Sequence, residues 1–175
     1  MTTDAAHIFV LEGPAGSGKT EIMRRMANIA SSNGLVASLH APTGQAAVRL
    51  SLRTGLPATT IHSALYDRSG HPTDNDTDDH EWPPTIEFQR SEMASAGQIV
   101  LIDEASMIGD RRYNDEIEPP ELRFGEGQLL SDILASTAGC GGRVVFVGDG
   151  CQLPPFGEES PLALSLDELE KRGQR

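Results

Sequence analysis

Residues 13–20 read "GPAGSGKT", the segment that most clearly indicates a fold class. It fits the pattern G-x-x-x-x-G-K-[ST], in which glycines let backbone N–H groups turn toward a phosphate and a lysine supplies positive charge. An apolar run, "HIFVLE" (7–12), precedes it, and apolar residues at helical spacing follow from Ile22 to Ala30. A strand, a loop and a helix in this order are the context that the motif requires. The alternative is a chance glycine-rich turn, which would not need these neighbours.

The loop predicts a site for a nucleotide. The Lys19 ammonium is expected to reach the β- and γ-phosphates and to act in catalysis, and the Thr20 hydroxyl is expected to bind Mg²⁺. The loop residues expected to contact the nucleotide are Gly13, Pro14, Ala15, Gly16, Ser17, Gly18, Lys19, Thr20 and Glu21.

The rest of the chain alternates apolar strand-like runs with helix-like segments, which predicts an α/β fold with a parallel sheet. Two stretches interrupt the alternation, at about 66–90 and 109–127, and we expect them to be irregular insertions, with "TIEF" (85–88) suited to a short strand. Strands are also expected at 35–42, 98–103 and 143–149, and helices at 44–53, 129–136 and 165–172.

The length and composition point to one domain spanning residues 1–175. A net charge of −12 argues against a generally basic nucleic-acid binder, although a local groove can still be positive. No apolar run is long enough to span a membrane, and the first residues lack a basic leader region, so we expect a cytoplasmic protein with no membrane partner. We also expect a monomer. Cys140 and Cys151 are expected to be reduced, and no histidine or cysteine spacing typical of zinc is present.

Two acidic residues follow the apolar run "QIVLI". Ligands of open α/β sheets gather at the carboxyl ends of strands, so Asp103 is expected to hold Mg²⁺ there. Glu104 is expected to orient or deprotonate the attacking water. Taken alone, an Asp-Glu pair after a strand can equally be a solvated loop; the glycine loop earlier in the chain favours the catalytic interpretation.

Four further blocks follow the glycine loop: "APTGQAA" (41–47), "TIHSAL" (60–65), "LIDEASM" (101–107) and "GDGCQLPP" (148–155). With the glycine loop, they occur in the order seen in the first RecA-like domain of superfamily 1 DNA helicases of the RecD-like, 5′-to-3′ branch. The sequence resembles that family over nearly its whole length outside the two insertions. The resemblance implies a P-loop NTPase fold, with a RecA-like parallel β-sheet flanked by helices on both faces, and the use of ATP and Mg²⁺.

The resemblance also implies roles for residues outside the glycine loop. Gln152 is expected to sense the γ-phosphate as a catalytic and nucleotide-binding residue, and Asp149 to support its loop. The residues expected along a single-stranded DNA path are Pro42, Thr43, Thr60 and His62. Three of the named residues have a structural alternative: Gln152 as a surface glutamine, Thr60 as a helix N-cap and His62 as a half-buried histidine.

Three departures from the family pattern qualify these expectations. Gly150 stands where the family usually has proline, and twelve residues before Gly13 leave no room for the motif that reads adenine. The sequence stops at Arg175, before the motifs of the second RecA-like domain and its arginine finger, which we expect to be supplied in cis or in trans. ATP binding with slow hydrolysis is therefore expected, and unwinding only with that second domain. The alternatives are a truncated or free-standing nucleotide-binding module with negligible catalysis, and a small-molecule kinase, which leaves the later motifs unexplained.

Overall fold

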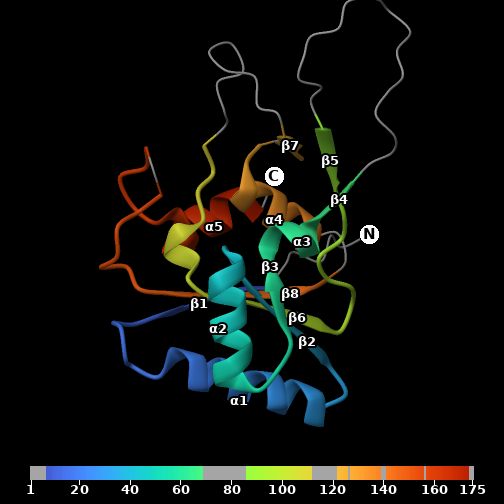
Figure 1. Ribbon diagram of the computed structural model, residues 1–175, viewed down its shortest axis with the longest axis vertical. Coiled ribbons are helices and arrows are strands. Elements are labelled where there is room, and N and C mark those ends of the chain that lie inside the picture. Colours follow the sequence, from blue (N-terminus) through green and yellow to red (C-terminus); the bar gives the residue numbers. More distant parts are fainter. Residues whose placement is uncertain are drawn as a thin grey trace, which may run out of the picture.

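The computed structural model describes residues 7–68, 86–111, 122–125, 127–138, 141–155 and 157–173. A five-stranded sheet lies at its centre, in the order β1-β8-β6-β2-β3, and each neighbouring pair runs parallel (Figure 1). All five strands therefore end at the same edge of the sheet. The strands are β1 (His7–Glu12), β2 (Val36–Ala41), β3 (Ala58–Thr60), β6 (Gln98–Ile102) and β8 (Arg143–Gly148).

Helices cover both faces of this sheet. They are α1 (Lys19–Ser32), α2 (Gly44–Thr54), α3 (Ile61–Leu65), α4 (Leu129–Ala138) and α5 (Leu166–Gly173), with 3₁₀ turns η1 (Ala105–Met107) and η2 (Leu162–Leu164). Figure 1 shows α1 on one side of the sheet and α4 and α5 on the other. This confirms the predicted α/β architecture.

The two central strands explain why both faces are covered. Successive strand side chains point to opposite faces, so a strand buried on both faces reads as a continuous apolar run. Val100 and Ile102 of β6 pack in one core cluster with residues of α3, α4 and α5, whereas Leu101 packs in the other with residues of α1 and α2. Val144 and Phe146 join the first cluster, and Val145 and Val147 the second.

A second, smaller sheet forms from the ends of the two stretches expected to be irregular. Strand β5 (Ile86–Arg90) pairs antiparallel with β4 (Tyr66–Arg68) and parallel with β7 (Leu122–Phe124). Strand β5 overlaps the expected "TIEF" strand. The sequence pattern does not predict β4 or β7, because three residues carry no periodicity. Residues 69–85, 112–121 and 126 of these two stretches lie outside the described residues.

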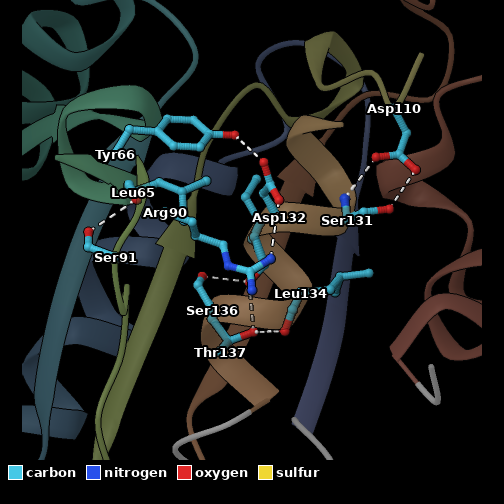
Figure 2. A network of polar contacts seen from close by, with 11 residues as sticks. Leu65, Tyr66, Arg90, Ser91, Asp110, Ser131, Asp132, Leu134, Ser136 and Thr137 are labelled. Atoms are coloured by element: carbon cyan, nitrogen blue, oxygen red, sulfur yellow. Dashed lines mark hydrogen bonds and ion pairs between the residues drawn. The ribbon is translucent and has the colours of Figure 1, made fainter. Parts of the chain in front are cut away.

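A buried carboxylate attaches the small sheet to the main body (Figure 2). Asp132 of α4 is 1% exposed; its Oδ2 accepts a hydrogen bond of 2.7 Å from the Tyr66 hydroxyl, and its Oδ1 lies 3.2 Å from Arg90 Nη1. Burial, followed by this carboxylate, raises the pKa of Tyr66. Close by, the Asp110 carboxylate accepts hydrogen bonds of 2.8 Å from both the backbone N–H and the hydroxyl of Ser131, and so caps the first turn of α4.

Two further observations concern the surface and the cysteines. Within the described ranges, no helix is both long and apolar enough to cross a membrane. Cys151 is an exposed free thiol, and Cys140 lies outside the described residues.

Candidate nucleotide site

The glycine loop connects β1 to α1 at the carboxyl edge of the sheet. Gly16 and Gly18 have φ values of 78° and 90°, a region that favours glycine, and Gly18 is the N-cap of α1. The Gly13 N–H donates a 3.1 Å hydrogen bond to the carbonyl of Gly148, the last residue of β8. The loop is therefore held against the neighbouring strand while its turn faces the N-terminus of a helix, where anions bind.

Lys19 and Thr20 open helix α1, and Lys19 turns back over the loop. Its ammonium donates hydrogen bonds to the carbonyl oxygens of Gly13 and Pro14, the latter at 2.9 Å. Glu21 behaves differently, since its carboxylate pairs along the helix surface with Arg24 and Arg25, at 2.6 and 2.8 Å. These two arginines lower the pKa of Glu21 to about 2. The structure thus brings Lys19 to the loop and directs the Glu21 side chain along the helix.

Asp103 directly follows the last residue of β6, the strand that pairs with β8. Its backbone N–H donates a 2.9 Å hydrogen bond to the His40 carbonyl of β2, and its carboxylate accepts the Glu104 N–H at 3.0 Å. Burial raises the pKa of Asp103, and the Glu104 N–H, followed by the Lys19 charge, partly offsets that effect. Asp103 is therefore a partly buried carboxylate within the electrostatic reach of Lys19.

Glu104 has an unusual backbone. Its φ of 52° is the one positive value among the non-glycine residues that the structure describes. Such a conformation carries a cost of about 1–3 kcal/mol and persists where the surroundings enforce it. The Glu104 side chain is 33% exposed, and its Oε1 lies 3.4 Å from Nη2 of Arg49 on α2.

The loop after β8 places Gln152 near the same edge. The buried Asp149 carboxylate accepts the Cys151 N–H at 3.0 Å, and the Asp149 carbonyl accepts the Gln152 N–H at 3.1 Å. The Gln152 side chain accepts a 3.2 Å hydrogen bond from the Ser106 hydroxyl through its amide oxygen. A Cβ at Gly150 would meet the Glu12 carboxylate, so glycine allows these two segments to approach closely.

The residues expected to contact DNA follow the other two strands of the sheet. Ala41 of β2 and Thr60 of β3 are register partners, so Pro42 and Thr43 emerge from the edge beside Thr60. The Thr43 hydroxyl accepts the Ala46 N–H at 3.2 Å and caps α2. The Thr60 hydroxyl accepts the Ser63 N–H at 3.2 Å and caps α3. The N-cap interpretation of Thr60 thus describes its local structure.

His62 lies against the small sheet. Its ring centroid is 5.0 Å from that of Phe124 in an edge-to-face arrangement and 5.6 Å from that of Tyr66. Burial lowers the pKa of His62. This is the half-buried environment considered as the alternative to a DNA contact.

Sequence reasoning did not single out Arg49 or Ser106. Arg49 is 55 positions from Glu104, and Ser106 is 46 positions from Gln152, so no local pattern signals either contact. The sequence signal for Ser106 is weak: it is a polar residue inside the block "LIDEASM" (101–107), and the structure buries it completely.

Two comparisons with known proteins agree with this arrangement. The family model described as "AAA domain" matches residues 1–118. The ATP-dependent RecD2 DNA helicase of Deinococcus radiodurans is 32% identical over 157 residues, which are 89% of this chain and 17% of that protein. The chain thus spans about one sixth of the length of this relative. The first match shows that the chain belongs to the AAA domain family, in agreement with the glycine loop on a RecA-like P-loop NTPase fold, and the second shows that it is related to a RecD2 DNA helicase.

Proposed function

We propose that this chain binds ATP with Mg²⁺ and hydrolyses the nucleotide as the N-terminal motor domain of a RecD-like DNA helicase. The observation that carries the proposal is the common edge of the sheet. The glycine loop, Asp103 and Gln152 follow the carboxyl ends of β1, β6 and β8, which are neighbours in the sheet. Ligands of parallel α/β sheets bind at that edge.

The described residues fit a nucleoside triphosphate and a magnesium ion. Gly16 and Gly18 have the backbone freedom that a phosphate cradle needs, and Lys19 already lies over the loop. Thr20 and Asp103 offer hydroxyl and carboxylate oxygens, the donors that Mg²⁺ prefers, and they would hold the ion. When bound, Mg·ATP supplies the phosphoryl group that is transferred to water.

Each residue then has a proposed task. Lys19 neutralises charge on the phosphates, and Glu104 orients the attacking water and accepts its proton. The Gln152 amide N–H₂ donates a hydrogen bond to the γ-phosphate. Asp149 fixes the backbone of that loop by accepting hydrogen bonds from the N–H groups of Cys151 and Gln152. The proposed nucleotide-contacting residues are those that the sequence predicts. Glu21 would contribute through its backbone, because its carboxylate pairs with Arg24 and Arg25.

The DNA path and the wider assembly belong to the same proposal. Pro42, Thr43, Thr60 and His62 would contact the sugar–phosphate backbone of single-stranded DNA beside the nucleotide, and translocation would run 5′ to 3′. A second RecA-like domain, in cis or in trans, would supply the arginine finger, and unwinding requires it. We propose that residues 1–175 form one RecA-like domain that is monomeric and cytoplasmic.

The second candidate is a nucleotide-binding module with negligible catalysis. The ion pair between Glu104 and Arg49 favours it, because that pair engages the carboxylate that must accept a proton from water. Both candidates share the nucleotide site and differ in turnover.

Nucleotide-dependent thermal stabilisation and steady-state hydrolysis separate these possibilities. Mg·ATP should raise the melting temperature of the parent, and Lys19→Ala should remove that rise. Glu104→Gln should keep the rise but lose the slow hydrolysis. Equal stabilisation of parent and Lys19→Ala would refute the nucleotide site. Hydrolysis unchanged by Glu104→Gln would leave the binding module as the better description.

A further inference from the structure

A single buried hydrogen bond joins two motifs of the candidate site. Ser106 lies in η1, two residues after Glu104, and is 0% exposed. Its hydroxyl donates to Oε1 of Gln152 at 3.2 Å, whereas Gln152 itself lies at the surface. A wholly buried donor thus holds the exposed side chain proposed to sense the γ-phosphate.

The backbone that carries Ser106 is tightly packed. A Cβ at Gly148, the last residue of β8, would lie 3.2 Å from the Ser106 backbone nitrogen and 2.9 Å from Leu164 Cδ1. The turn is closed by hydrogen bonds from the Met107 N–H to the Glu104 carbonyl, at 3.0 Å, and from the Ile108 N–H to the Ala105 carbonyl, at 3.1 Å. The Ser106 backbone, and with it the hydroxyl, is therefore held in a fixed position against the end of β8.

A serine hydroxyl can donate or accept, so the ligand selects which end of the Gln152 amide must stay free. A glutamine amide has an acceptor oxygen and a donor nitrogen, whereas phosphate oxygens at neutral pH mainly accept. Because Ser106 engages the oxygen, the N–H₂ group is the end left to donate. The opposite amide orientation would present an oxygen to the phosphate and repel it.

We propose that Ser106 is a positioning residue that holds Gln152 with its amide N–H₂ available to the γ-phosphate. This inference rests on the proposed ATPase function. Since Ser106 and Glu104 share one closed turn, the same contact links the position of the γ-phosphate sensor to that of the residue that activates water.

An equilibrium comparison tests the inference without turnover. We would measure the affinities of the parent, Ser106→Ala and Gln152→Ala for ADP and for a non-hydrolysable ATP analogue, both with Mg²⁺. Ser106→Ala should weaken binding of the analogue about 3- to 10-fold, the usual worth of one hydrogen bond, and leave ADP binding unchanged. Gln152→Ala should show at least the same loss, and the double variant should match Gln152→Ala.

Ser136→Ala is the matched control. Ser136 is also buried and donates its hydroxyl to a carbonyl, that of Ile133 at 2.8 Å within α4, with no part in the candidate site. Both of its nucleotide affinities should equal those of the parent. If Ser106→Ala fails to fold, Ser106→Cys, with similar volume and a weaker donor, carries the same comparison.

The outcomes separate the inference from the function on which it rests. A parent that binds neither nucleotide would contradict the proposed function. A parent with a γ-phosphate preference that Gln152→Ala reduces and Ser106→Ala does not would overturn the inference alone. An additional loss from Ser106→Ala in the Gln152→Ala background would also overturn it, because Ser106 would then act independently of Gln152.

Discussion

Two pairs of acidic residues show how differently one side chain type is used in this molecule. Asp103 and Glu104, at the edge of the main sheet, are partly exposed and are held by few protein contacts. Asp110 and Asp132, beside the small sheet, are buried and surrounded by hydrogen-bond donors from α4, α5 and the small sheet. A carboxylate whose oxygens are satisfied by protein donors stabilises a structure, whereas one with free lone pairs can bind a metal ion or a proton. Contacts with protein donors, rather than residue type, therefore distinguish the structural carboxylates from those of the candidate site.

The largest expected effect comes from removing a scaffold carboxylate. Asp132→Ala should lower the free energy of unfolding by about 3–5 kcal/mol, because it leaves the Tyr66 hydroxyl and the Arg90 guanidinium without their buried partner. Urea denaturation measures the loss. Asp67→Ala, an exposed aspartate on β4, is the control and should change stability by less than about 0.5 kcal/mol. Similar losses for both would break the distinction between scaffold and surface carboxylates.

Buried His40 of β2 should make the free energy of unfolding depend on pH. Burial lowers its pKa from 6.5 to about 4, so the folded state takes up the proton less readily than the unfolded state. The stabilisation is complete above pH 6.5 and is lost as the pH falls toward 4, by about 2–3 kcal/mol at pH 4.5. Urea denaturation at pH 7.5 and 4.5 checks this. His40→Gln should show a correspondingly smaller pH dependence, and an unchanged dependence would assign it to other groups.

Thr60 tests whether one residue can serve both structure and site. Thr60→Ala should lower the free energy of unfolding by about 1 kcal/mol, because it removes the N-cap of α3. It should also weaken single-stranded DNA binding to a similar extent for different base sequences, since backbone contacts carry no sequence information. Thr60→Ser, which keeps the hydroxyl, should restore both properties. Restored stability with DNA affinity still lost would show that the hydroxyl is not the DNA contact.

The smallest effect is expected at Gly150, on the candidate-site side. Gly150→Ala should cost less than about 1 kcal/mol, because the added Cβ meets only the end of the exposed and flexible Glu12 side chain. Combining it with Glu12→Ala should remove even that cost in thermal melts. A large loss that persists in the double variant would mean that the backbone at this position, rather than the Glu12 contact, requires glycine.

The parts of the fold that the sequence predicts are those with local patterns. The apolar runs of β1, β6 and β8 and the glycines around Lys19 carry their own signals, and the structure forms a strand, a loop and a helix there. Strands β4 and β7 carry no such signal, because they become strands by pairing with β5. The contacts from Arg49 to Glu104 and from Ser106 to Gln152 likewise depend on the order of β8, β6 and β2 in the sheet. Sequence reasoning could name the carboxylate and the glutamine, but it could not find the partners that hold them.

The left-handed backbone of Glu104 has a consequence for protein engineering. Glycine would relieve the backbone strain at this position. In Glu104→Gly, that relief offsets part of the destabilisation caused by the greater conformational entropy of glycine in the unfolded chain. The same substitution removes the carboxylate proposed to activate water. A directed-evolution screen that selects for heat resistance alone would therefore tolerate loss of activity at this position. Selection for turnover would have to oppose that drift and retain the strain.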